Sequence, residues 1–218
     1  MNEFSMNAQQ VIELDAVLQK VRQYYDEKLA KYGPIPSGVD WNSFESQTMR
    51  FEQLLRILDG SSSFSINDYG CGYGALVDYI GNKGYSFHYR GFDISDRMIT
   101  KARELHKELR NCEFSTDETR LRRADYTIAS GIFNVKLDTD AEKWENYVIR
   151  TVRTIARLSE KGFAFNALTK YSDPDLMRTD LYYPDPLFLF DYCERNFSRF
   201  VALLHDYPLY EFTILVRM

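Results

Sequence analysis

The chain has 218 residues and a formal net charge of −5, so it is long enough to bury one substantial core and short for two. This mildly acidic balance argues against nucleic acid as an obligatory partner, because nucleic-acid-binding domains usually carry a basic face. The three cysteines and three histidines show neither paired nor metal-ligand spacing, and no apolar run could span a bilayer, so we expect no disulfide framework, no metal site and no membrane insertion.

The first sixty residues predict two helices. Apolar positions recur near helical period over 8–31, and a segment rich in proline and glycine at 33–38 ends that helix. Asn42 or Ser43 can cap the second helix, and Gly60 ends it.

The segment 63–75 is the most informative part of the chain. It indicates a short strand, an acidic residue at its end, Asp68, and a tight loop that opens a helix. Glycines alternate through the loop at Gly70, Gly72 and Gly74. Because glycine tolerates positive φ and has no Cβ, the loop can turn sharply and a ligand can lie against its backbone. The partly positive helix N-terminus points at the same spot.

Two kinds of nucleotide loop fit this stretch. A dinucleotide loop, Gly-x-Gly-x-x-Gly/Ala, could use Gly70, Gly72 and Ala75 against a pyrophosphate. The alternative pattern, Asp-x-Gly-x-Gly-x-Gly, places the Asp68 carboxylate beside the loop. A carboxylate repels a pyrophosphate in a partly dry cleft and suits a ligand that carries ammonium and sulfonium groups. Asp68 therefore favours the second pattern.

The next strand supports a nucleoside ligand. The aromatic-rich run 85–93 predicts a strand that ends at Asp93, about twenty residues beyond the glycine loop, where an acid can accept both ribose hydroxyls. Ser95 is a plausible N-cap for the following helix. Met98 lies on the apolar face of that helix and could pack on an adenine, although core packing is the commoner role.

The remaining sequence alternates strands and helices to about residue 197, including a long helix over about 140–159. This alternation predicts a mostly parallel sheet with helices on both faces. Only 207–209 separates the last two strands, so the final strand should be antiparallel. We interpret 1–60 as a helical lid that covers the substrate, and 61–218 as one compact ligand-binding domain.

Segments 67–74 and 89–95 resemble the first two motifs of class I S-adenosylmethionine-dependent methyltransferases. Later segments resemble the family's remaining strands, in order, at 111–117, 124–134, 161–168 and 199–217. Three N-terminal segments resemble a little-characterised bacterial subgroup of that family, 32–34, 38–42 and 47–51. The resemblance implies a Rossmann-like sheet of seven strands, mostly parallel with an antiparallel last strand. It also implies S-adenosylmethionine as cofactor and S-adenosylhomocysteine as product.

The resemblance also assigns roles within the cofactor site. The glycine loop would lie against the methionine part, Asp93 would take the ribose, and Asp117 would approach the adenine amino group. From the N-terminal segment we expect Arg50 to pair with the methionine carboxylate and Trp41 to cover the cofactor. The expected cofactor-binding residues are Trp41, Arg50, Asp68, Gly70, Cys71, Gly72, Tyr73, Gly74, Asp93, Ile94, Met98, Asp117, Ser130 and Gly131.

Methyl transfer from a sulfonium is an in-line displacement with a good leaving group, so alignment and desolvation can supply much of the acceleration. A general base is required only if the acceptor must first lose a proton. His205, Asn134 and Tyr171 are the candidates to act as a base or to orient an acceptor, and a structural role is the competing interpretation for His205.

These patterns predict a methyltransferase that acts on a small molecule. Three alternatives stay open at this point: a methyltransferase for protein or RNA, an NAD-binding oxidoreductase, and a cofactor-binding protein without catalysis. The lack of a cleavable signal peptide and of paired cysteines favours the cytoplasm. The sequence leaves open whether the protein is a monomer or a homodimer.

Overall fold

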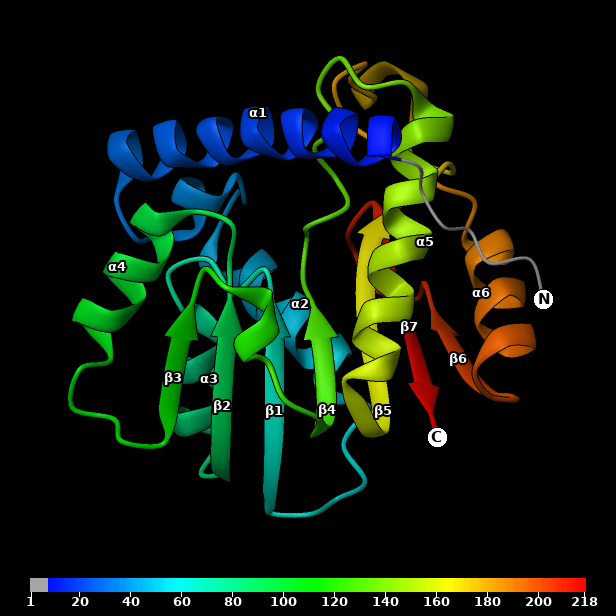
Figure 1. Cartoon of the computed structure of the whole chain (residues 1–218). Helices are drawn as coiled ribbons and strands as arrows, with labels where there is room; N and C mark the ends of the chain where they lie inside the picture. Colours follow the sequence, from blue (N-terminus) through cyan, green and yellow to red (C-terminus); the bar gives the residue numbers. More distant parts are fainter. Residues whose placement is uncertain (1–7) are drawn as a thin grey trace.

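The computed structural model describes residues 8–218, with side chains from residue 14 onward. Seven strands form one sheet in the order β3-β2-β1-β4-β5-β7-β6 (Figure 1). The strands are β1 (Ser63–Tyr69), β2 (Ser86–Phe92), β3 (Cys112–Ser115), β4 (Ala124–Ala129), β5 (Ser159–Leu168), β6 (Phe200–Leu204) and β7 (Glu211–Arg217). The first five strands pair in parallel, and β7 runs antiparallel to both β5 and β6. The expected Rossmann-like sheet is confirmed.

Helices cover both faces of this sheet, as expected. The α-helices are α1 (Ala8–Tyr32), α2 (Phe44–Leu55), α3 (Ala75–Asn82), α4 (Asp96–Leu105), α5 (Ala141–Arg157) and α6 (Pro186–Asn196). Side chains of α2, α3 and α4 form one apolar core with one face of the sheet, and those of α5 and α6 form a second core with the other face. Short 3-10 turns occur at η1 (Pro36–Val39), η2 (Glu118–Arg120) and η3 (Pro174–Leu176).

Local sequence sets the helix boundaries. The Ser43 hydroxyl accepts from the Ser46 amide at the start of α2, and the Ser95 hydroxyl accepts from the Met98 amide at the start of α4. Both serines satisfy backbone donors that the first helical turn leaves unpaired. The α2 helix ends at Leu55, earlier than the Gly60 boundary expected from the sequence, because Ile57 and Leu58 continue in tighter turns.

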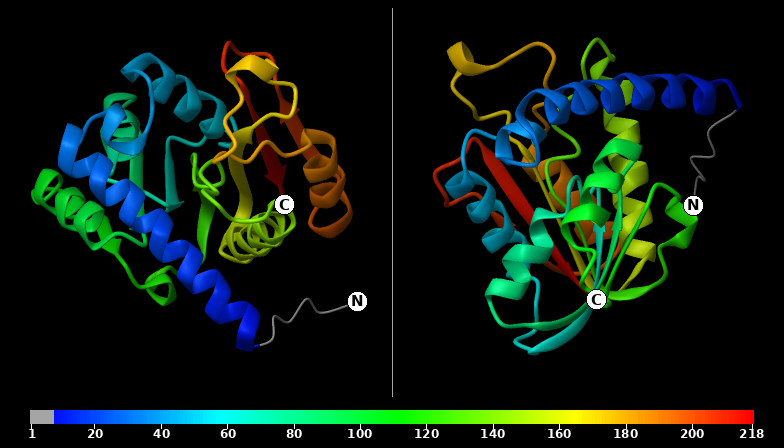
Figure 2. Two further views of the ribbon diagram at one scale, coloured as in Figure 1. Left: turned by 90° about the horizontal axis from the view of Figure 1, so that it is seen from above. Right: turned by 90° about the vertical axis from the view of Figure 1, so that its left-hand side faces the viewer.

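The two N-terminal helices are placed differently. The α1 helix runs across the carboxyl ends of the strands, as the view from above in Figure 2 shows. The α2 helix packs into the core with Leu54 fully buried beside strand residues such as Ile66. Within residues 8–218, no helix is both long and apolar enough to cross a membrane. No group of three His, Cys, Asp or Glu side chains gathers among the described residues to hold a metal ion.

Replacing Leu54 with alanine should test whether α2 is part of the folding unit. Its side chain is completely buried, so we expect a loss of about 2–5 kcal/mol in unfolding free energy, measured by chemical denaturation. The control is Phe44→Ala on the same helix, because Phe44 is 62% exposed and its removal should change stability by less than about 0.5 kcal/mol. Equal effects of the two variants would show that α2 does not depend on this burial.

Candidate cofactor site

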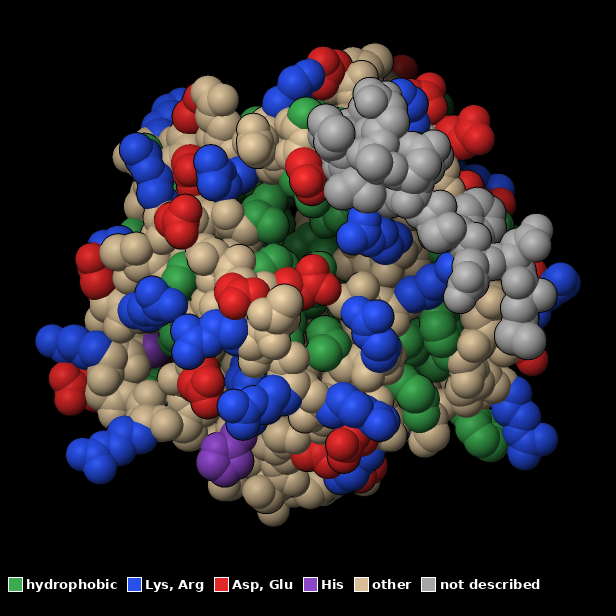
Figure 3. Space-filling view, viewed as in Figure 1, with side chains coloured by type: hydrophobic (Ala, Val, Ile, Leu, Met, Phe, Trp, Pro, Cys, Tyr) green, Lys and Arg blue, Asp and Glu red, His purple; other side chains and the backbone are tan. Residues whose placement is uncertain are grey.

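A pocket lies between α1 and the carboxyl ends of the strands. It holds about 920 Å³ of empty space, part of it open to solvent. Figure 3 shows the hollow below α1, with hydrophobic side chains inside it. Its walls come from α1, from the segment between α1 and α2, and from the ends of β1, β2 and β4. This is the edge where doubly wound sheets bind their ligands.

The glycine loop forms the floor of this pocket. The amides of Gly70 and Cys71 both donate to the carbonyl of Phe92, which ties the loop to the end of β2. Gly70 adopts φ +86°, and a Cβ there would lie 2.1 Å from the side chain of Ile132. Only glycine fits this close approach, so the loop backbone remains open to a ligand.

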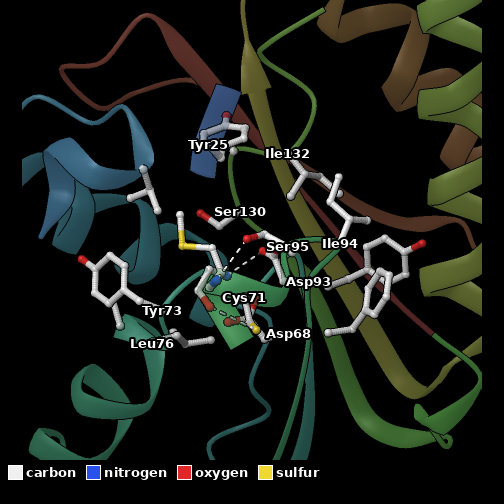
Figure 4. A pocket seen from close by; sticks show the side chains of 18 of the residues that line it. Tyr25, Asp68, Cys71, Tyr73, Leu76, Asp93, Ile94, Ser95, Ser130 and Ile132 are labelled. Atoms are coloured by element: carbon white, nitrogen blue, oxygen red, sulfur yellow. Dashed lines mark hydrogen bonds between the residues drawn. The ribbon is translucent and has the colours of Figure 1, made fainter. Parts of the chain in front are cut away.

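Asp93 holds the next part of the loop. One carboxylate oxygen accepts from the Gly72 amide at 2.9 Å, and the other accepts from the Ser95 amide at 2.9 Å (Figure 4). Burial raises the pKa of Asp93 to about 6, although both amide hydrogen bonds act in the opposite direction. The carboxylate therefore fixes the loop and still presents lone pairs to the pocket.

Asp68 is a second carboxylate in the same pocket. It is 4% exposed and accepts a hydrogen bond of 2.7 Å from the Tyr89 hydroxyl. Burial raises the pKa of Asp68 to about 7, and the nearby Asp93 raises it further while the Tyr89 hydroxyl lowers it. Two neighbouring buried acids repel each other when both are ionised, so a cationic ligand would offset this repulsion.

The wall opposite the glycine loop follows β4. Gly131 adopts φ +73° and lies against the ring of Trp41. The Ser130 hydroxyl is buried and has no hydrogen-bond partner within residues 14–218. An unpaired buried hydroxyl is costly unless a ligand or water satisfies it, and Figure 4 shows Ser130 among the side chains that line the pocket.

The α1 helix supplies the roof. Figure 4 shows Tyr25 projecting from α1 toward the side of the pocket that holds Ile132. Burial raises the pKa of Tyr25, so its hydroxyl stays protonated at neutral pH and can donate a hydrogen bond. A hydrogen bond from the Ser95 hydroxyl to Asp26 fastens the roof to the start of α4.

The structure brings most of the expected residues to this pocket. Those that line it are Trp41, Asp68, Gly70, Cys71, Gly72, Tyr73, Asp93, Ile94, Met98, Ser130 and Gly131. Gly74 caps α3 just outside the lining, and its missing Cβ leaves room for the buried ring of His106. The roles assigned to these residues toward a cofactor stay predictions.

Two of the expected cofactor-binding residues, Arg50 and Asp117, do not line this pocket. The Arg50 guanidinium makes a two-pronged ion pair with Glu211, in which Nε donates to Oε2 at 2.9 Å and Nη2 donates to Oε1 at 2.5 Å. Arg50 is thus already paired within the chain and does not line the pocket. Asp117 is exposed and turned back on its own loop, where its carboxylate caps Thr119 and lies outside the pocket lining. Sequence spacing placed both residues near the correct strand or helix but could not give the direction of the side chains.

The catalytic candidates also lie away from this pocket. His205 and Tyr171 are exposed, with ring centroids 6.1 Å apart, and the side-chain oxygen of Asn134 accepts from the Leu168 amide. None of the three lines the pocket. Sequence analysis missed Tyr25, Gln47 and Tyr147 as lining residues, because their helical spacing indicated only ordinary packing faces.

Comparisons with known proteins decide the family. A family model for a methyltransferase domain matches residues 66–159. Rv1506c of Mycobacterium tuberculosis (strain ATCC 25618 / H37Rv), which bears the provisional name of a methyltransferase, is 48% identical over 163 residues; the match covers 75% of this chain and 98% of that protein. The chain belongs to the class I S-adenosylmethionine-dependent methyltransferases. Its cofactor is therefore S-adenosylmethionine.

Solved structures share the fold at low sequence identity. The magnesium protoporphyrin IX methyltransferase ChlM from Synechocystis PCC 6803, solved with S-adenosylmethionine, aligns with a TM-score of 0.63 at 16% identity, over 99% of both chains. The N-methyltransferase NodS from Bradyrhizobium japonicum WM9, solved with S-adenosylhomocysteine, gives 0.62 at 16% identity over 90% of this chain and 97% of NodS. The [4+2]-cyclase SpnF also gives 0.62 at 16% identity, over 86% of this chain and 74% of SpnF.

The acidic pair predicts how cofactor affinity of this methyltransferase depends on pH. The pKa values of about 7 for Asp68 and about 6 for Asp93 mean that both acids are mostly ionised, the form that attracts a cationic ligand, only above about pH 7 and are mostly protonated below about pH 6. Binding should release protons, so affinity for S-adenosylhomocysteine should fall by about tenfold between about pH 7.5 and about pH 5.5. Calorimetric titration across this range would measure it, and Asp68→Asn should flatten the profile. A pH-independent affinity would contradict the prediction.

Asp93 and Asp117 form a matched pair of acids for testing the ribose assignment. Asp93→Ala should weaken S-adenosylhomocysteine binding by about tenfold or more, because it removes both the expected ribose acceptor and the anchor of Gly72. Asp117→Ala should leave the dissociation constant unchanged, since that carboxylate lies outside the pocket. Calorimetry on both variants provides the measurement, and the reverse order of effects would restore the adenine assignment of Asp117.

Proposed function

We propose that this protein transfers the methyl group of S-adenosylmethionine to a small-molecule acceptor by in-line displacement. The observation that carries the proposal is the position of two buried acids, Asp68 and Asp93, beside a glycine loop whose backbone faces the pocket. These acids suit the ammonium, the sulfonium and the ribose hydroxyls of the cofactor.

The residues of the pocket have separate roles in this proposal. The loop Gly70–Gly74 lies against the methionine part, Asp93 accepts from the ribose hydroxyls, and the Ser130 hydroxyl gains a partner in the amino group. Ile94 and Met98 flank the adenine. Trp41 closes the methionine end of the pocket, in agreement with its contact with Gly131.

A small acceptor fits the enclosed site better than a macromolecule. The α1 helix crosses the pocket, and the bond between Ser95 and Asp26 holds it there. We assign residues 1–60 to a segment that covers the acceptor, although α2 within it belongs to the core. ChlM, which shares the fold, is named for methyl transfer to the small molecule magnesium protoporphyrin IX, and this supports a small acceptor here. NodS, which also shares the fold, is named as an N-methyltransferase.

The chemical step requires little from the protein beyond alignment. Bound S-adenosylmethionine would supply the methyl group: the acceptor's electron pair would form the new bond to the methyl carbon, and the sulfur of S-adenosylhomocysteine would keep the electrons of the broken carbon–sulfur bond. The protonated Tyr25 hydroxyl can orient an acceptor by a hydrogen bond but cannot act as a base at neutral pH.

We place this activity in the cytoplasm. The free cysteines Cys71, Cys112 and Cys193 agree with that reducing compartment.

Calorimetric titration with S-adenosylhomocysteine, with NAD as the control ligand, tests the cofactor. We expect micromolar binding of the first and none of the second, because the acids at the loop repel a pyrophosphate. A second assay follows transfer of a labelled methyl group to panels of small molecules, RNA and proteins. Label in RNA or protein alone would overturn the small-molecule proposal, and cofactor binding with no transfer to any panel would favour other chemistry on the same fold, as in SpnF.

A further inference from the structure

A chain of buried polar contacts links the N-terminal segment to the cofactor pocket through the sheet. It begins at Arg50 on α2, whose guanidinium pairs with Glu211 at the start of β7. The Glu211 carboxylate accepts from the side-chain amide of Asn166 on β5 at 2.6 Å. The side-chain oxygen of Asn166 accepts from the Gly131 amide at 2.8 Å, which brings the chain to the pocket wall.

Burial makes this chain sensitive to any break. Arg50 is 8% exposed, Glu211 1% and Asn166 0%. Removing one member of a buried charge network leaves the others without partners, which costs far more than losing an exposed ion pair. The remaining donor of Arg50, Nη1, also has a partner in the Ser46 carbonyl at 2.9 Å.

The charge of Glu211 sets the direction of the Asn166 amide. A carboxylate only accepts hydrogen bonds, so the NH₂ end of Asn166 must face Glu211. The oxygen end must then face Gly131, where it accepts the backbone N–H. Reversing the amide would oppose acceptor to acceptor and donor to donor at the two ends. Glu211 therefore acts on the pocket wall through Asn166.

The same arginine reaches the pocket wall by a second route. The Arg50 guanidinium stacks 4.7 Å from the ring centre of Trp41. A Cβ on Gly131 would lie 3.0 Å from that ring, so Trp41 packs directly on the loop that Asn166 anchors. Both routes converge on Gly131, next to the unpaired Ser130 hydroxyl.

We propose that Glu211 and Asn166 are positioning residues that hold the Ser130–Gly131 wall and Trp41 in the geometry that binds the cofactor. Through Arg50 they make this geometry depend on the docking of α2. The inference rests on the proposed cofactor site, since it assigns Ser130–Gly131 and Trp41 to one wall of that site. Neither Glu211 nor Asn166 touches the pocket, so their effect on binding is indirect.

The test compares wild type with Asn166→Leu, Glu211→Gln and the control Ser159→Ala. Ser159 is also buried on β5 and donates to the Ile155 carbonyl at 2.7 Å, but it lies at the opposite end of the strand. We expect Asn166→Leu to weaken S-adenosylhomocysteine binding by about tenfold or more. Glu211→Gln should weaken it as well, because the uncharged amide no longer fixes the direction of Asn166. Ser159→Ala should keep wild-type affinity.

A spectroscopic readout separates positioning from simple loss of stability. The chain has two tryptophans, and Trp144 is 1% exposed, so acrylamide quenching reports mainly on Trp41. S-adenosylhomocysteine should protect Trp41 from acrylamide in wild type and in Ser159→Ala, and should protect it less in the two network variants. Thermal melting of each apo variant identifies the temperature at which all are folded, and titrations are done below it.

Each outcome decides a separate question. Wild-type affinity and full protection of Trp41 in folded Asn166→Leu or Glu211→Gln would overturn the inference. Glu211→Gln keeps the side-chain volume, so it decides the case if Asn166→Leu fails to fold. Lack of binding by wild type would instead overturn the proposed cofactor site. An equal loss of affinity in Ser159→Ala would assign the effect to general destabilisation and also reject the positioning role.

Discussion

The candidate cofactor site depends on the hydrogen bonds that Asp93 accepts from two backbone amides. The amide of Gly72 binds one oxygen and that of Ser95 the other, so a single side chain connects the loop after β1 to the helix start after β2. The pairing of β1 with β2 brings these two strand ends together, with Tyr69 opposite Phe92. Because the acid is buried, its pKa rises, and the site carries an electrostatic cost that a cationic ligand can offset. The buried Asp93 carboxylate thus both holds the loop in place and favours a cationic ligand.

The N-terminal segment supplies the roof and one wall of the pocket, and the strand ends supply the rest. The α1 helix supplies the roof with few buried side chains of its own, Val21 and Leu29 among them, and relies on polar attachments such as the bond between Ser95 and Asp26. The α2 helix is attached by apolar burial instead, with Leu54 fully enclosed. Among residues 14–218, fewer buried apolar side chains hold α1 than α2, so α1 should open at a lower free energy than α2.

The sequence predicted those features that local chemistry controls. Alternating glycines, the acid at the end of each of the first two strands and the serine cap of α4 all depend on residues close in the chain, and the structure places Asp68, Asp93 and Ser95 together at the pocket. The sequence did not predict the position of side chains that can point in more than one direction. Asp117 turned to cap its own short loop, because a nearby backbone amide satisfied it without reaching the pocket. His205 and Tyr171 stayed at the surface, where no sequence pattern distinguishes exposure from participation in a site.

By itself, the sequence determined the order of strands and helices, the glycine loop, the position of its two acids and the family to which they belong. These follow from backbone preferences and spacing within about thirty residues, the length of one strand–helix–strand unit. Only the tertiary structure decided the partner of Arg50, because Glu211 lies 161 positions away and no local rule links them. It likewise decided the roof over the pocket, where Asp26 of α1 meets Ser95 at the start of α4. The direction of the Asn166 amide was also decided there, since Asn166 on β5 meets Glu211 on β7 only when these two strands pair.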